Sequence, residues 1–192
     1  MARACAEGLA DAGCLTVLKH APGHGRATLD SHENLPRITA PLAELEKTDF
    51  APFKALADLP LVMTAHIVLP ELDPDTPVTL SPKGMAHLRE TLGLEGLIMT
   101  DDISMGALTG PVADRGRAAL AAGCDLVLHC NGEMADMEAL VGGIGALSAE
   151  AQKRADVAVS TRRPPIDIDI PAVEAEFKAL IEGAKNDAGR RG

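Results

Sequence analysis

The chain has 192 residues, of which 46% are hydrophobic and 24% are charged, and its formal net charge is -10. This length and composition suffice for one buried core and exclude a wholly disordered chain. The acidic balance excludes nucleic acid as a partner, because like charges repel, and no stretch approaches the ~20 apolar residues of a membrane-spanning helix.

Short apolar runs alternate with helical periods along the chain. Ser81-Pro82 is a typical helix start, and Gly13, Gly93 and Gly123 are placed to end helices. In chain order, the pattern predicts a helix over 3–12, a strand over 15–19, a polar loop over 20–39, a helix over 42–57 interrupted at Pro52, a strand over 61–65, a helix over 81–92, a strand over 96–100, a helix over 114–122, a strand over 125–128, and helices over 133–144, 149–159 and 172–184.

This alternation predicts an α/β fold in which helices cover a parallel sheet. A closed (β/α)8 barrel needs eight strands and typically ~250 residues. Only four strands are recognised, so the sheet is expected to be open or to be half of a barrel. We expect a partial barrel domain over residues 1–160. Arg163-Pro164-Pro165 then marks an extended linker, and residues 161–192 hold that linker, a C-terminal helix and a tail.

Each predicted strand ends in polar residues, where parallel sheets and barrels gather their functional groups. These ends are Lys19-His20, Thr64-Ala65-His66, Thr100-Asp101-Asp102 and His129-Cys130-Asn131. Because the carboxyl ends of parallel strands meet at one edge, we expect them to share a site.

Three residues could carry acid, base and nucleophilic chemistry. In an extended loop, Asp30 and His32 project the same way, so the carboxylate can orient the imidazole and raise its basicity. Such a histidine can give a proton to a leaving oxygen and later take one from water. Asp101, at a strand end, could attack a sugar carbon. Together they would supply a retaining double displacement.

Neighbouring polar residues have structural interpretations. We expect Asp102 to be a cap, His24 to shape the loop and His87 to be exposed on a helix, whereas His66 and His129 fit packing or ligand contact equally well.

Four cysteines, Cys5, Cys14, Cys124 and Cys130, form no Cys-x-x-Cys pair, so we expect buried free thiols in a reducing compartment. No signal peptide is recognised, and the cytoplasm is the expected location. Because the first residue opens directly into a helical pattern, we expect the chain to be a fragment.

Several segments together resemble glycoside hydrolase family 3, and within it the bacterial β-N-acetylglucosaminidases that act on cell-wall fragments. The segments that carry the resemblance are Lys19-His20-Ala21-Pro22-Gly23-His24-Gly25, Asp30-Ser31-His32, Leu35-Pro36, Thr64-Ala65-His66, Thr100-Asp101-Asp102-Ile103-Ser104-Met105 and the run from Ala119 to Asp125. The resemblance covers most of residues 3 to 145.

The resemblance implies a role for each matching residue. Asp101 matches the nucleophile, His32 the acid/base and Asp30 its partner, while Lys19 and His20 match residues that bind sugar hydroxyls. The implied substrate is a muropeptide or glycan that ends in non-reducing β-N-acetylglucosamine. The implied setting is cytoplasmic peptidoglycan recycling, with no metal and no organic cofactor.

The resemblance also implies that this chain is the C-terminal half of a TIM-type (β/α)8 barrel, beginning at the helix before the fifth strand. Two sheet edges would then lack partners, and open edges invite self-association. We therefore expect weak activity, or none, from this polypeptide alone.

Three rival hypotheses remain. A zinc hydrolase could use His20, His24, His32, Asp30 and Asp101 as ligands, although Pro22 and Gly23 break the helix that His-x3-His spacing would need. A non-catalytic half-barrel could bind sugar without cleaving it. A β-glucosidase of the same family would lack the Asp-x-His loop, so Asp30-Ser31-His32 argues against that activity.

Overall fold

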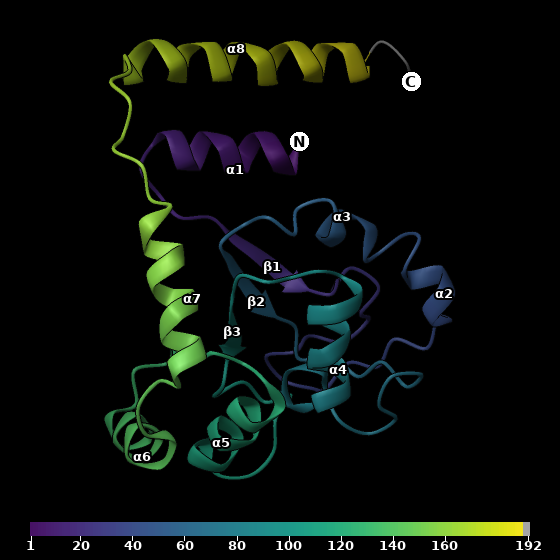
Figure 1. Ribbon diagram of the computed structural model, residues 1–192. Helices are drawn as coiled ribbons and strands as arrows, with labels where there is room; N and C mark the ends of the chain where they lie inside the picture. The colour runs from purple at the N-terminus through teal and green to yellow at the C-terminus, as the bar shows by residue number, and fades with distance from the viewer. Residues whose placement is uncertain (190–192) are drawn as a thin grey trace.

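The protein is described here by a computed structural model that covers residues 1–189, with side chains through residue 183. Four parallel strands form one sheet in the order β1-β2-β3-β4, with helices packed around it (Figure 1). The strands are β1 (Val17–Ala21), β2 (Leu61–Thr64), β3 (Leu97–Asp102) and β4 (Leu126–Leu128). The predicted α/β architecture is confirmed.

The register of the sheet is regular at its start and irregular near its polar end. Val17 lies opposite Leu61, and Leu61 lies opposite Leu97. The register shifts after Leu18 in the first pair and after Met99 in the last pair. Within the described residues, the outer edges of β1 and β4 have no strand beside them, as expected for half a barrel.

Most predicted helices form, with shifted boundaries. The helical segments are α1 (Ala2–Asp11), α2 (Leu42–Leu45), α3 (Ala51–Lys54), the 3-10 turn η1 (Val78–Leu80), α4 (Pro82–Ala86), the π-helical turn η2 (His87–Thr91), α5 (Val112–Ala122), α6 (Met134–Ile144), α7 (Ala149–Ser160) and α8 (Ile170–Gly189).

The start and stop signals explain several of these boundaries. The Ser81 hydroxyl accepts a hydrogen bond from the Gly84 amide at 3.1 Å and caps α4 as expected. Gly123 ends α5 with φ of +119°. The predicted interruption of the helix over 42–57 is present: α2 ends at Leu45, and Pro52 stands in the first turn of the separate helix α3.

The main core lies between the sheet and the helices on one of its faces. Val62 and Ile98 of the sheet belong to this core and are fully buried. Phe50, Leu88 and Leu94, from the surrounding helices and loops, pack in the same core and are also buried. Helix α5 packs against α4 and α6, and α7 packs against β3.

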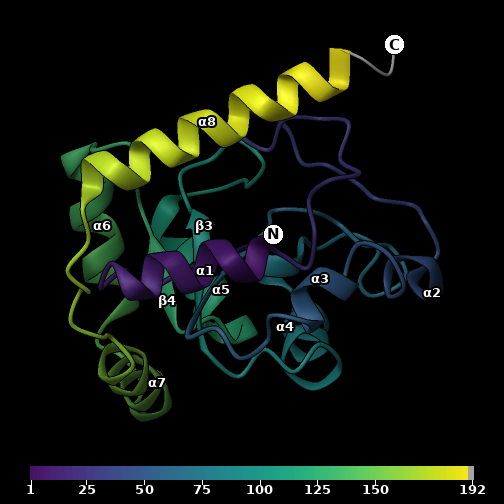
Figure 2. The same ribbon diagram turned by 90° about the horizontal axis from the view of Figure 1, so that it is seen from above.

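Helix α8 stands apart from this core. It follows the extended segment after α7 and lies outside the sheet and its covering helices, as the view from above shows (Figure 2). Its described side chains are exposed, among them Val173, Phe177 and Leu180. Among the helices of residues 1–189, none combines the length and apolar character that a membrane crossing requires.

Two expectations about burial were wrong. His87 is 7% exposed rather than on the surface, because η2 turns it toward Phe50 with ring centroids 5.5 Å apart. Burial lowers the pKa of His87. Of the four free cysteines only Cys124 is buried. Cys5 lies on α1, Cys14 follows that helix and Cys130 follows the edge strand β4. All three are exposed.

A buried carboxylate joins three elements at the amino end of the sheet. Asp125, 5% exposed, precedes β4 and accepts a hydrogen bond from the Ile98 amide at 2.8 Å. It also accepts one from Arg89 of η2 at 2.6 Å and one from Arg154 of α7 at 2.8 Å. The carboxylate therefore holds a strand and two helices together.

Replacing Asp125 by Ala should destabilise the fold by about 3 kcal/mol, because two guanidinium groups and a buried amide lose their acceptor. Urea unfolding followed by circular dichroism measures the change. Asp114→Ala, which removes the exposed pair with Arg117, is the control and should shift the midpoint little. Equal effects of the two substitutions would contradict this role for Asp125.

Candidate active site

The polar ends of the strands meet as predicted. The His20 Nε2 atom at the end of β1 lies 3.5 Å from an Asp101 carboxylate oxygen at the end of β3. Burial lowers the pKa of His20, although the charge of Asp101 acts in the opposite direction. The other carboxylate oxygen of Asp101 accepts the Asp102 amide at 2.8 Å. Asp101 is thus fixed through one oxygen, while the other faces His20.

Asp102 is structural, which confirms the expectation that it acts as a cap. Its carboxylate accepts hydrogen bonds from the Ser104 amide at 3.0 Å, the Ser104 hydroxyl at 2.7 Å and the Cys130 amide at 3.1 Å. Burial acts to raise the pKa of Asp102, but these hydrogen bonds outweigh it and hold the pKa below its ordinary value. The carboxylate therefore stays charged while it ties the end of β4 to β3.

His66, beyond the end of β2, is fully buried and bonded through both ring nitrogens. Its Nε2 atom lies 3.0 Å from the Asp102 carbonyl oxygen, which can only accept, so Nε2 carries a hydrogen. Its Nδ1 atom lies 2.8 Å from the Thr79 hydroxyl. Burial lowers the pKa of His66, which favours the neutral ring. Packing is thus its observed role, one of the two that the sequence left open.

Asp30 and His32 form the expected pair on the loop after β1. The Asp30 carboxylate lies 2.8 Å from His32 Nδ1 and accepts the His32 amide at 2.9 Å. The side-chain hydrogen bond to Asp30 raises the pKa of His32, and the His32 amide and ring lower the pKa of Asp30. Because the carboxylate only accepts, Nδ1 carries a hydrogen and Nε2 is left as the atom that can exchange a proton.

This loop is docked against the segment that follows Asp101. The Gly106 amide donates to the His32 carbonyl at 2.9 Å, and the Ala107 amide donates to the Ser31 carbonyl at 3.2 Å. Ser31 is buried, and its hydroxyl lies 3.2 Å from His24 Nε2, consistent with a loop-shaping role for His24.

Not every predicted site residue is drawn into contact. The Lys19 side chain is exposed and makes no hydrogen bond or ion pair among the described residues. Within residues 1–183, no hydrogen bond or ion pair joins His32 to Asp101, although the charges of Asp101 and Asp102 contribute to the raised pKa of His32. Both ring nitrogens of His129 are buried without a partner.

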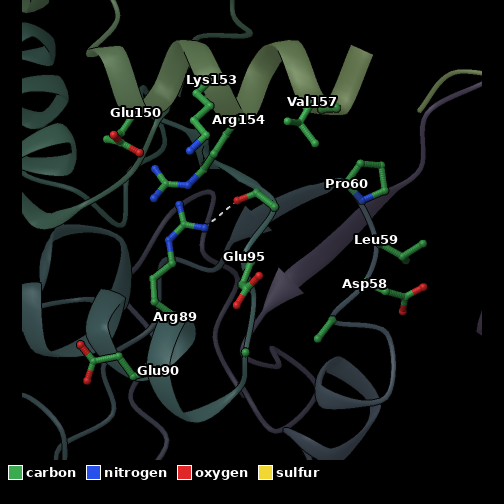
Figure 3. A pocket seen from close by; sticks show the side chains of 14 residues that line it. Asp58, Leu59, Pro60, Arg89, Glu90, Glu95, Glu150, Lys153, Arg154 and Val157 are labelled. Atoms are coloured by element: carbon green, nitrogen blue, oxygen red, sulfur yellow. Dashed lines mark hydrogen bonds between the residues drawn. The ribbon is translucent and has the colours of Figure 1, made fainter. Parts of the chain in front are cut away.

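A cavity of about 800 Å³ lies at the opposite end of the sheet. It is lined by segments that precede β2 and β3, and by Arg89 and residues of α7 such as Lys153 and Arg154 (Figure 3). None of the predicted site residues lines it. Functional groups in parallel α/β folds gather at the other edge, so we assign the chemistry to the strand ends around Asp101.

The zinc hypothesis gains no support from the geometry. In the part of the chain that the structure describes, no three His, Cys, Asp or Glu side chains are arranged to hold a metal ion.

The partners that hold the site residues could not be predicted from the sequence. Thr79 sits in the unpredicted turn η1, and Gly106 and Ala107 carry no motif of their own. Their contacts join residues far apart along the chain, so no local spacing could have indicated them.

Comparisons with known proteins identify relatives. The family model described as the glycosyl hydrolase family 3 N-terminal domain matches residues 1–162. A β-hexosaminidase of Bordetella pertussis is 42% identical over 141 residues, 71% of this chain and 40% of the relative. One from Alkalilimnicola ehrlichii is 45% identical over 136 residues, 68% of this chain and 39% of that protein.

A solved structure agrees with these relatives. NagZ from Neisseria gonorrhoeae, in complex with N-trifluoroacetyl-D-glucosamine, superposes with a TM-score of 0.63 at 32% identity, covering 84% of this chain and 45% of that one. The chain thus spans about two fifths of the length of the curated relatives it matches.

Replacing Asp30 by Asn should lower the pKa of His32 toward its ordinary value, because a neutral amide stabilises the imidazolium less than a carboxylate does. An NMR pH titration of the histidine ring signals measures the shift. The pKa of His66, which depends on burial elsewhere, should not change and serves as the internal control. An unchanged His32 titration would show that the pair does not form in solution.

Proposed function

The chain belongs to glycosyl hydrolase family 3, and from this we propose that it carries the catalytic half of a retaining β-N-acetylhexosaminidase. The substrate would be a muropeptide or related glycan that ends in non-reducing β-linked N-acetylglucosamine. The observation that carries the proposal is the Asp30–His32 pair on a loop docked just beyond Asp101.

In the first step, Asp101 would act as the nucleophile. Its free carboxylate oxygen attacks the anomeric carbon, and the bond from that carbon to the leaving oxygen breaks. His32, protonated at Nε2, gives its proton to the leaving oxygen. The Asp30 carboxylate favours this protonated ring, which is why the raised pKa of His32 suits a general acid.

In the second step, the same imidazole would act as a base. Nε2 of His32 takes a proton from water while the water oxygen attacks the anomeric carbon, and the ester bond to Asp101 breaks. The sugar leaves with its original anomeric configuration, and both residues return to their starting protonation states.

Lys19 and His20 would bind hydroxyl groups of the sugar. Lys19 lies in the middle of β1 with an exposed side chain that is free to donate, and His20 lies beside the attacking carboxylate. The lowered pKa of His20 favours a neutral ring, which can hydrogen-bond to a hydroxyl without placing a second full charge next to Asp101.

We further propose the cytoplasm and peptidoglycan recycling as the setting, with no metal or organic cofactor. Residues 1–160 would form the partial barrel domain, and residues 161–192 the linker, helix and tail. Support for this division comes from the family match, which ends at residue 162, and from the exposure of α8. The open edges of β1 and β4 would allow self-association.

A second candidate function is a half-barrel that binds sugar without cleaving it. The observation that favours it is that, among the described residues, no hydrogen bond or ion pair joins His32 to Asp101. Titration calorimetry with N-acetylglucosamine, run beside a turnover assay, separates binding from catalysis.

Asp101→Asn should abolish turnover of a chromogenic N-acetylglucosaminide while the circular dichroism spectrum is retained, because an amide is a poor nucleophile. Asp114→Asn, on the exposed face of α5, is the matched control and should keep the rate of the unmodified chain. Normal rates from Asp101→Asn would refute the nucleophile assignment, and binding without turnover in the unmodified chain would favour the second candidate.

His32→Ala should slow both steps by about 100-fold or more, since one residue serves both. Substrates with very good leaving groups need no protonation and should recover the first step only. Comparing nitrophenyl and alkyl glycosides measures this difference. Equal losses on both substrate classes would contradict a general-acid role for His32.

A further inference from the structure

The loop that bears His32 is fastened to the same strand end that carries Asp101. Two backbone hydrogen bonds make the attachment, from the Gly106 amide to the His32 carbonyl and from the Ala107 amide to the Ser31 carbonyl. Both hydrogen bonds are between backbone groups, so no side-chain motif in the sequence predicts them.

The segment between Asp101 and Gly106 is itself held in place. The Ile103 amide donates to the Leu128 carbonyl at 2.8 Å, and the Met105 amide donates to the Asp102 carbonyl at 3.2 Å. Ser104 is bound to the Asp102 carboxylate through its amide and its hydroxyl. A displacement of the His32 loop relative to Asp101 therefore requires the two bonds at Gly106 and Ala107 to break.

Gly106 fits this position because it has no side chain. A Cβ atom there would lie 2.8 Å from the His32 carbonyl oxygen and 2.9 Å from that of Glu33, closer than Cβ contacts normally come. Both neighbours are backbone atoms, which cannot swing aside as a side chain would. The φ of Gly106 is not in the positive range, so space rather than backbone conformation demands glycine.

The turn around Asp30 is the part that a Cβ would disturb. The amides of Glu33 and Asn34 donate to the Asp30 carbonyl at 3.1 and 2.9 Å, and this turn brings the Asp30 carboxylate onto His32. Pushing the carbonyls of residues 32 and 33 outward would shift the turn and loosen the contact between carboxylate and ring.

We propose that Gly106 is a positioning residue, and that the peptide groups of Gly106 and Ala107 clamp the acid/base loop at a set place relative to the nucleophile. The assignment of these two roles rests on the proposed function. The clamp makes the docked position of His32 its resting position, so that substrate meets a loop already ordered, and this lowers the entropy cost of assembling the site.

Hydrogen exchange measured residue by residue by NMR on the unmodified chain is the first test. The amides of Gly106 and Ala107 should exchange more than about tenfold slower than in an unstructured peptide, because each is held in a hydrogen bond. Exchange at unstructured rates would overturn the proposal. This result does not depend on any variant folding, nor on turnover.

Gly106→Ala, compared with Gly25→Ala, is the second test. Gly25 lies in the same loop, also without positive φ, and a Cβ there would meet nothing within 4 Å. Gly106→Ala should remove the protection of the Ala107 amide and lower the pKa of His32 toward its ordinary value, while amides of β2 keep their protection. Gly25→Ala should change neither.

Unchanged protection and titration in Gly106→Ala, or equal effects from Gly25→Ala, would overturn the positioning role. A failure of the proposed function is distinguishable from a failure of the clamp. It would appear as normal turnover in Asp101→Asn, with the amides of Gly106 and Ala107 still protected.

Discussion

The carboxylate and carbonyl of Asp102 hold three strand ends together. The carbonyl oxygen accepts a hydrogen bond from the buried ring of His66, which follows β2. The carboxylate accepts a hydrogen bond from the amide of Cys130, which follows β4. Two further hydrogen bonds from Ser104 shape the turn after β3. The neighbouring Asp101 is thereby fixed at the sheet edge, although Asp102 takes no part in the proposed chemistry. A charged group kept ionised by hydrogen bonds is well suited to this role, because every bond it accepts is charge-assisted.

Three histidines near the site, His20, His32 and His66, have pKa values that are not all shifted in the same direction. His32 is exposed beside a carboxylate, which favours the charged ring, whereas His20 and His66 lose water through burial, which favours the neutral ring. In the proposed mechanism, His32 would therefore be the imidazole that transfers the proton. The others can hydrogen-bond without adding charge next to Asp101. Such separation of pKa values within one site is typical of acid-base catalysis.

The two ends of the sheet serve different purposes. At the amino end, Asp125 joins Arg89 and Arg154, which line the cavity of about 800 Å³, and so links two helices to a strand. At the carboxyl end, the same strands present Asp101 and His20. Within residues 1–189, the sheet that supports both ends has four strands, with β1 and β4 at its edges. The spacing between His20 and Asp101 follows from the pairing of β1 with β2 and of β2 with β3.

The sequence by itself determined the four parallel strands, the order of the helices and the gathering of polar residues at one sheet edge. These features follow from hydrophobic periodicity, helix caps and helix-ending glycines, which are local signals that one sequence is enough to show. It also indicated Asp30 beside His32, since residues two apart in an extended loop face the same way. Tertiary structure decided the burial of His87, the exposure of Cys5, Cys14 and Cys130, and the docking of the loop on Gly106. Each of these depends on which surface another element covers. Contacts between residues far apart in the sequence have no characteristic local spacing, so they cannot be predicted from it. They form only when the whole sheet has been assembled.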